Sequence, residues 1–306
     1  MPEDVITPML TTVKRTSEVD VAVVMACELG EGPRWDPDGR RLLFVDVLAG
    51  HLHAASTDRG LVLTRQVGQA LGAVNRSEDG GLVLAMRDGI YLADADGARL
   101  RLFASVEGDQ PDLRMNDAAC DPAGRLWAGT MAFDATSAAG TLYRIDTDGT
   151  VTSVLTGLSI SNGLGWSPDA EQMYFVDSPT QRIDVLDFDL ATGTVNNRRP
   201  FALIADTPGV PDGLTIDAEG GIWVALWGGA QVRRYAPDGR VTDIVDLPVD
   251  QPTSCTFGGD AGDILYITTA RLGLTDEQLT ASPLAGSVLA CRPGYRGHPA
   301  HSFNSG

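Results

Sequence analysis

One short phrase returns six times along the chain, and this repeat limits the possible fold more than any other feature. Each copy is a turn of the Asp-Pro-x-Gly kind followed by an apolar, aromatic-rich strand, as in WDPDGRRLLFVD and CDPAGRLWAGTM. The turns recur every 42–50 residues. Repeats of about 40–50 residues that hold several short strands are typical of four-stranded propeller blades. The six copies are residues 35–46, 77–86, 120–131, 166–177, 216–227 and 257–268.

The rest of the chain also favours strands over helices. Segments such as LLFVDV and QMYFVD are apolar on both faces, which fits strands packed between neighbouring blades. The 35 Gly and 17 Pro bound these segments, as turns in a sheet protein do. The best helical candidate, residues 275–279, is about one turn long. We therefore expect an all-β, six-bladed β-propeller over residues 20–292.

The two ends of the chain carry no copy of the phrase. Residues 1–19 are polar, and we expect them to be a flexible N-terminal arm. A strand at 21–26 precedes the first copy, and another at 287–291 follows the last. We expect the N-terminal strand to pair into the last blade, because ring closure removes exposed sheet edges. The tail, residues 293–306, is rich in Gly, Pro and His and is expected to be frayed.

Charge and targeting signals exclude several classes of partner. The net charge of −18 argues against nucleic acid and anionic membrane surfaces, since both would repel the chain. The N-terminus lacks a signal-peptide pattern, and no stretch approaches 18 apolar residues. The four cysteines show no close spacing. We expect a cytoplasmic protein with reduced thiols, and a monomer because a propeller is self-contained.

One position of the repeat points to a functional site. Counting back five residues from the turn residue reaches an oxygen-bearing side chain in four copies: Glu31, Asn116, Asn162 and Asp212. Equivalent positions at the start of the innermost strands converge on the axis of a propeller. Asn and Asp also cap turns, but capping needs neither a shared register nor a Glu. Two carboxylates and two amides form an oxygen-only set of the kind that hard divalent cations prefer.

The chain lacks the residues of several other kinds of site. Its four histidines, His51, His53, His298 and His301, all lie away from the shared register. A histidine base or a zinc triad is therefore disfavoured. No GxSxG elbow, P-loop or dinucleotide fingerprint follows a strand. An enzyme built on this chain would have to work through a metal and carboxylates.

Three residues near the register are candidates for contacts with a substrate. Arg114 and Asp117 flank Asn116, and the planar donor fork of an Arg suits substrate oxygens. The alternative is a surface Arg paired with an acid such as Asp112. Asp134 lies on the loop side of the third repeat, where a pocket should open, but it could equally be a solvated loop acid.

Five segments resemble the senescence marker protein 30/gluconolactonase/luciferin-regenerating-enzyme-like family, which includes regucalcin and bacterial sugar lactonases. They occur in the expected order between about residues 28 and 292. The segments are ELGEGPRW, RMNDAACDPAGRLWAGTM, SNGLGWSPD, VPDGLTIDAEGGIWVALW and PTSCTFGGD. The resemblance implies a six-bladed propeller with one divalent cation in its channel, which could be Ca²⁺, Mg²⁺, Mn²⁺, Zn²⁺ or Fe²⁺.

The resemblance also implies roles for individual residues. Glu31, Asn162 and Asp212 would bind the metal, and Asp212 would also be the catalytic acid and base. Arg114 and Asn116 would contact substrate. The position of Asp134 can hold a Glu that touches sugar hydroxyls in the family. Here it is the shorter Asp, with Phe133 before it in place of another acid, which suggests a differently shaped or less polar pocket.

Together these features predict a carboxylic ester hydrolase that opens a sugar lactone to the aldonic acid. The cation would polarise the carbonyl and activate water. Asp212 would move the proton, while Arg114, Asp117 and Asp134 would orient hydroxyls. The side-chain amide of Asn116 would donate to the oxyanion. Three alternatives remain: another ester or organophosphate hydrolase, a non-enzymatic calcium-binding regulator, and a scaffold that binds protein on its face.

Overall fold

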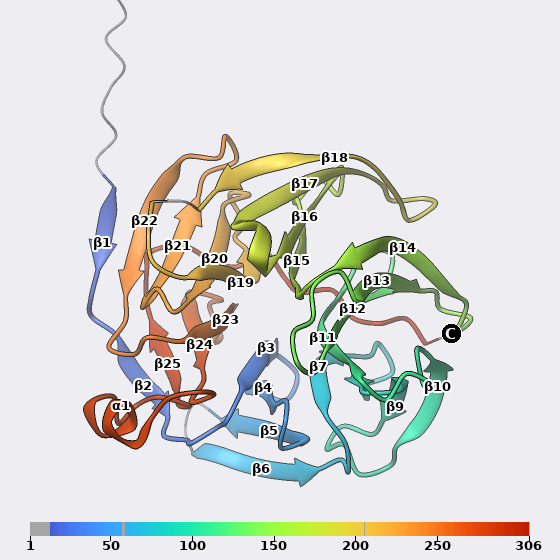
Figure 1. The fold of residues 1–306 in the computed structure, drawn as a ribbon, viewed down its shortest axis with the longest axis horizontal. Coiled ribbons are helices and arrows are strands. Elements are labelled where there is room, and N and C mark those ends of the chain that lie inside the picture. Colours follow the sequence, from blue (N-terminus) through green and yellow to red (C-terminus); the bar gives the residue numbers. More distant parts are fainter. Residues whose placement is uncertain (1–12, 57–58, 205, 306) are drawn as a thin grey trace, which may run out of the picture.

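Six four-stranded antiparallel blades surround a central channel, as the repeat predicts (Figure 1). The computed structural model describes residues 13–56, 59–204 and 206–305. The first three blades are β3–β6 (Gly30–Asp36, Arg41–Asp46, His51–Ser56, Gly60–Gln66), β7–β10 (Leu71–Arg76, Leu82–Met86, Gly89–Ala93, Arg101–Ser105) and β11–β14 (Leu113–Cys120, Leu126–Ala132, Gly140–Ile145, Val151–Leu158). The next two are β15–β18 (Ser161–Trp166, Gln172–Asp177, Arg182–Asp189, Thr194–Leu203) and β19–β22 (Val210–Ile216, Ile222–Trp227, Gln231–Tyr235, Val241–Asp246).

The sixth blade closes the ring with strands from both ends of the chain. It contains β23 (Pro252–Gly258), β24 (Ile264–Thr269), β25 (Val288–Cys291) and the N-terminal β2 (Asp20–Val23). β2 pairs antiparallel with β25, as Figure 1 shows by the blue strand beside a red one. The predicted closure is confirmed, and the outermost position of the last blade is filled.

Each gap between neighbouring blades contains its own apolar cluster. Trp127 and Phe175 pack between the third and fourth blades, and Phe44 and Tyr266 pack between the sixth and first. Four further clusters fill the other gaps. Full burial of one such large side chain contributes about 1.5–3 kcal/mol. Strands that are apolar on both faces are therefore required here, because each sheet has a neighbour on either side.

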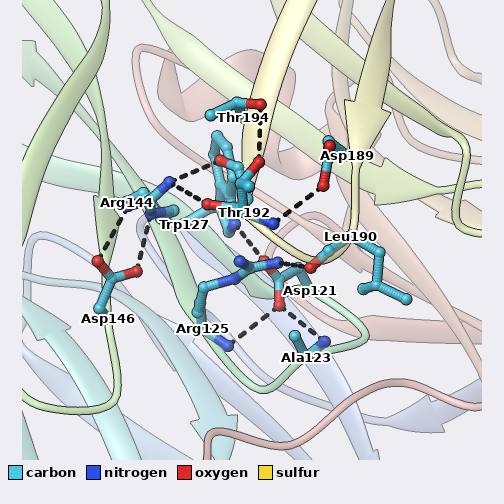
Figure 2. A network of polar contacts seen from close by, with 11 residues as sticks. Asp121, Ala123, Arg125, Trp127, Arg144, Asp146, Asp189, Leu190, Thr192 and Thr194 are labelled. Atoms are coloured by element: carbon cyan, nitrogen blue, oxygen red, sulfur yellow. Dashed lines mark hydrogen bonds and ion pairs between the residues drawn. The ribbon is translucent and has the colours of Figure 1, made fainter.

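The recurring Asp-x-x-Gly-x-x-Trp phrase has a structural cause. It forms the turns that follow the inner strands, and the end of the channel where these turns lie is called the turn side below. Asp121 Oδ1 accepts the backbone N–H groups of Ala123 and Arg125. Its Oδ2 accepts from Arg125 Nε at 2.6 Å and from Trp127 Nε1 at 2.9 Å (Figure 2). Asp217 is bonded in the same way, with Trp223 as the indole donor. Each turn is thereby fixed to the buried indole of the following strand.

Part of the expected N-terminal arm is ordered. β1 (Lys14–Thr16) pairs parallel with β22 and adds a fifth strand to the fifth blade. The Arg15 guanidinium also pairs with Asp246 at 3.0 Å. The expectation of flexibility is therefore wrong for these residues, because an open sheet edge offered backbone partners. Residues 1–12 lie outside the described part of the chain.

The C-terminal tail is not frayed. Residues 296–304, called the C-terminal strap below, cross the turn side of the channel (Figure 1). The strap accepts the N–H of Ala218 in the fifth blade and donates from Asn304 to Gly124 in the third. Phe303 is fully buried and packs edge-on against Phe103. Backbone pairing and one aromatic anchor thus replace the disorder that the tail's composition suggested.

Three smaller features complete the fold. α1 (Asp276–Ala281) is a single helix with a Thr275–Gln278 capping box, where the one helical turn was expected. Of the described helices, none is long and apolar enough to cross a membrane. All four cysteines are buried free thiols.

Candidate active site

All six inner strands carry one extra residue at the same level of the channel. In the first blade Glu31 pairs with Val45, but the next pair is Arg34 with Leu43. Equivalent register shifts occur in the other five inner strands. Such bulges redirect side chains and are frequent beside active sites. Four of the bulges hold the predicted oxygen donors, and Gly72 and Thr253 occupy the same position in the other two blades.

Small residues next to the donors let the inner strands approach each other. A Cβ atom at Gly163 would lie 2.7 Å from the backbone oxygen of Asp212. One at Gly213 would collide with the hydroxyl of Ser254. The Asn-Gly and Asp-Gly pairs of the fourth and fifth blades are therefore needed for neighbouring donors to face one channel.

A chain of hydrogen bonds fixes the two asparagines. Arg114 Nη1 donates to Asn116 Oδ1 at 2.7 Å, and Asn116 Nδ2 donates to Asn162 Oδ1 at 2.7 Å. Asn116 Nδ2 also donates to the Ser161 carbonyl, while Asn162 Nδ2 donates to Ser178 Oγ at 2.8 Å. Both hydrogens of Asn116 are used, so the expectation that this amide donates to an oxyanion does not fit the structure. Asn162 Oδ1 keeps one lone pair for a further partner.

The two carboxylates at this level are buried and poorly compensated. Glu31 Oε2 accepts the N–H of Gly32 at 2.9 Å, whereas Asp212 Oδ1 is buried with no partner among the described residues. Burial, with the charge of Asp117, raises the pKa of Glu31 to about 8. Burial, followed by the charges of Glu31 and Asp117, raises the pKa of Asp212 well above its usual value. The pair therefore needs an additional cation to remain ionised.

Among the cationic side chains, Arg114 has the largest effect on the pKa values of this carboxylate pair. The guanidinium is 5% exposed, so the alternative of a surface Arg paired with Asp112 is not what the structure contains. Burial lowers its pKa to about 10, while Glu31 and Asp212 oppose the shift, so it stays charged at neutral pH. Arg114 Nε is buried and, within the described chain, has no acceptor. One donor and one acceptor, Arg114 Nε and Asp212 Oδ1, are thus left without partners in the same site.

Asp117 differs from the other two carboxylates because it is paired with Arg34 of the first blade. Its Oδ1 accepts the N–H of Ala118 at 2.7 Å and lies 3.8 Å from Arg34 Nη2. Arg34 also donates to Asn75 Oδ1 and to the Ala118 carbonyl, which joins the first three blades. Arg34 was not predicted from the sequence, because its partners belong to other blades and leave no local pattern in ELGEGPRW.

Asp134 is the one predicted site residue that the structure does not bring into the buried group. It lies on the exposed loop between β12 and β13, and its Oδ1 accepts the N–H of Thr136 at 2.9 Å. The preceding Phe133 is 45% exposed, and its ring centroid lies 5.9 Å from Arg114 Cζ. A substrate contact by Asp134 stays a prediction. The residues that the structure does bring together are Glu31, Arg114, Asn116, Asp117, Asn162 and Asp212.

The donor set fits a hard divalent cation. Glu31, Asn162 and Asp212 offer two carboxylates and one amide oxygen. In the residues that the structure describes, no three His, Cys, Asp or Glu side chains form a cluster that could hold a metal. A cation among Glu31, Asn162 and Asp212 would give the unpartnered Asp212 oxygen a ligand and offset the repulsion between the carboxylates.

Known proteins share both the sequence and the fold. Residues 29–271 match the SMP-30/Gluconolactonase/LRE-like region. The chain is 41% identical over 245 residues to pentonolactonase XacC of Haloferax volcanii, covering 80% of this chain and 82% of that protein. It is 34% identical to regucalcin of Xenopus laevis over 277 residues, or 89% and 93% of the two chains. The solved structure of a calcium-binding regucalcin from Agrobacterium tumefaciens matches with a TM-score of 0.92 and 31% identity, covering 96% of this chain and all of that one (100%).

Proposed function

This chain belongs to the SMP-30/gluconolactonase/LRE-like family, and from that premise we propose that it hydrolyses a sugar lactone with the help of one divalent cation. One observation carries the proposal: Asp212 Oδ1 and Arg114 Nε are a buried acceptor and a buried donor without partners in one site. A lactone and a water molecule supply the complementary groups. The name of the 41% identical pentonolactonase supports the same substrate class.

Glu31, Asn162 and Asp212 are the residues that would hold the cation. When bound, it supplies positive charge that polarises a carbonyl and lowers the pKa of water. Because all three donors are oxygens, Ca²⁺, Mg²⁺ and Mn²⁺ fit better than Zn²⁺, which prefers nitrogen and sulfur. Arg114 balances part of the carboxylate charge from the other side.

Asp212 is the residue that moves the proton. One oxygen of its carboxylate accepts a proton from water as the water oxygen bonds to the lactone carbonyl carbon. The acyl carbon–ring oxygen bond then breaks, and the same proton passes from Asp212 to the departing ring oxygen. The products are a carboxylic acid and a hydroxyl on one open-chain sugar acid.

Arg114 binds and orients the lactone. Its Nε–H is the unpartnered donor, so it replaces the Asn116 amide as the group that meets the carbonyl oxygen. Asn116 instead holds the guanidinium in place by accepting from Nη1. Phe133, exposed beside Arg114, provides an apolar surface for the carbon side of a sugar ring, with Asp134 next to it for a hydroxyl.

The test is acid release from a panel of lactones. Metal-stripped protein is mixed with aldono-1,4- and aldono-1,5-lactones in a pH-indicator assay, and Ca²⁺, Mg²⁺, Mn²⁺, Zn²⁺ or Fe²⁺ is restored separately. We expect turnover that needs a cation and disappears in Glu31→Ala. Turnover that is equal in the stripped protein and in Glu31→Ala would contradict the role of the cation.

A second candidate is a calcium-binding protein without turnover. The observation in its favour is the oxygen-only donor set, together with the description of the 31% identical Agrobacterium tumefaciens regucalcin as calcium-binding. Tight Ca²⁺ binding by calorimetry, with no acid release from any lactone and any cation, would favour this function over hydrolysis.

A further inference from the structure

A cavity of about 540 Å³ lies where the inner strands lead into the turns that hold Asp121 and Asp217. Its walls are the far ends of the inner strands, and residues 296–301 of the C-terminal strap form another side. Its volume is in the range of small-molecule sites. Glu31, Asn162 and Asp212 of the candidate active site do not line this cavity. Arg34 does, and this residue also pairs with Asp117.

The lining of this cavity is cationic in a strongly acidic protein. It includes three arginines and two histidines but one acidic residue: Arg34, Arg76, Arg296, His298, His301 and Asp260. Asp260 is paired with Arg40, and Arg76 with Asp36 and Asp38. Among the described residues, the side chain of Arg296 has no ion pair or hydrogen bond, and this residue is exposed at the rim of the cavity. Arg296 therefore brings a guanidinium that no carboxylate among these residues neutralises.

The charge is supplied by guanidinium groups rather than by the imidazole of His301. Burial, with the charge of His298, lowers the pKa of His301. His301 is therefore neutral at physiological pH and offers a polar ring instead of a charge. A small anion in this cavity would meet mainly the forked donors of Arg296.

The cavity is also lined by aromatic side chains. Trp127 and Trp223 donate their indole N–H groups to the turn aspartates Asp121 and Asp217. Trp166 lines the cavity, but its indole N–H is buried beside Trp127 and Phe188 and has no acceptor among the residues that the structure describes. Trp35 and Phe257 add aromatic rings to the same lining. Such rings pack against the carbon skeleton of an organic ligand.

We propose that this cavity is a second binding site, separate from the candidate active site, for a small organic carboxylate. The Arg296 guanidinium binds the carboxylate, and the aromatic rings of the lining contact the carbon chain of the ligand. The C-terminal strap is then a part of a binding site as well as a bridge between blades. The proposal concerns binding alone and does not depend on lactone hydrolysis.

The test is calorimetric titration of the full chain with sodium D-gluconate, sodium acetate and inorganic phosphate. The variants are Arg296→Ala and, as a matched control from the same end of the chain, Arg292→Ala. Arg292 pairs with Asp263 and lies outside the cavity. We expect gluconate to bind wild type and Arg292→Ala equally, and Arg296→Ala about tenfold more weakly, through loss of one charge-assisted hydrogen-bonded pair.

Two further measurements separate this site from the active site. Asp212→Asn should keep the gluconate affinity of the wild type, since its substitution lies at the other end of the channel. Equal unfolding midpoints for Arg296→Ala and wild type would show that the fold is intact. Gluconate binding that is unchanged in Arg296→Ala, or lost in Asp212→Asn, would overturn the proposal, as would binding of phosphate without either carboxylate. Absence of lactone turnover would leave this result standing.

Discussion

Asp212 and Asp217 lie five residues apart, on β19 and in the turn that follows it. Their carboxylates differ in how many hydrogen-bond partners they have. Both side chains are buried. Asp217 accepts four hydrogen bonds, from two backbone N–H groups, the Trp223 indole and the Arg234 guanidinium. Asp212 has an oxygen with no described partner and a strongly raised pKa. The same residue type is fully hydrogen-bonded in the turn and keeps one oxygen without a described partner at the bulge, where we propose that it binds a ligand.

The third blade repeats this difference and shows that it belongs to the architecture. Asp121 at the turn has four donors, drawn in Figure 2, in a network that reaches the Leu190 carbonyl of the next blade through Arg125. Five residues earlier, Asn116 is held by Arg114 and faces the channel. In the turn, the backbone N–H groups of the turn itself are hydrogen-bond partners of the aspartate. In the bulge, the side chain is turned away from its own strand.

The largest expected effect is on turnover in Asp212→Asn. The amide cannot accept and return a proton, so we expect the rate to fall about 10³-fold, within the usual range for general acid–base groups. The unfolding free energy in EDTA should stay equal or rise, because an uncompensated buried charge is removed. Initial rates with the best lactone and urea unfolding measure the two effects. A variant with wild-type rates would refute the proton-transfer role.

The opposite result is expected for Asp217→Asn. This substitution removes the buried carboxylate 2.7 Å from Arg234 Nε and leaves the guanidinium with the exposed Glu219 at 3.4 Å. We therefore expect a loss of about 3–5 kcal/mol of unfolding free energy. Asp121→Asn, which removes the equivalent partner of Arg125, is the matched variant. The folded fraction of each should keep its specific activity. Urea unfolding that matches wild type would show that these networks are not what stabilises the turns.

The register of the repeat was enough to predict the fold and four of the buried donors, because one period places equivalent residues at one level of the channel. Arg34 was missed because its partners, Asn75 and Ala118, belong to other blades and leave no local pattern. The hydrogen bonds of Asn116 depend on how its amide is turned, which no sequence shows. The strap was missed because a single buried Phe303 in a Gly- and Pro-rich tail has no periodicity.

The gain in unfolding free energy on cation binding should depend on Glu31 at the bulges and not on Asp121 in the turn. Saturation at 100 times the dissociation constant is expected to add about 2.7 kcal/mol to the unfolding free energy. Glu31→Gln should lose most of this gain, because it removes one of the two proposed carboxylate ligands. Asp121→Asn should keep the gain despite its lower starting stability. Urea unfolding with and without Ca²⁺ in both variants measures the difference. An equal gain in Glu31→Gln would place the cation elsewhere.

The smallest effect concerns His53, a buried group whose unpartnered atom lies outside the channel site. Its Nε2 has no partner among described residues, and burial, with the charge of His51, lowers its pKa from 6.5 to about 4. The unfolded chain therefore takes up the proton first as the pH falls. The stability from this group is complete above about pH 6.5 and declines towards pH 4, by about 1–2 kcal/mol after solvent screening.

His53→Leu should remove this part of the pH dependence, and Asp212→Asn should not. Urea midpoints at pH 7 and pH 5 for both variants measure it, with metal kept out by EDTA. His53 packs against Phe44 and forms a hydrogen bond with Thr64 through Nδ1. It therefore remains neutral and part of the packed core, although its Nε2 has no partner among the described residues. An unchanged pH slope in His53→Leu would mean that other groups set the acid sensitivity. The expected result would show that an unpartnered buried atom, as at His53, does not by itself mark a ligand site.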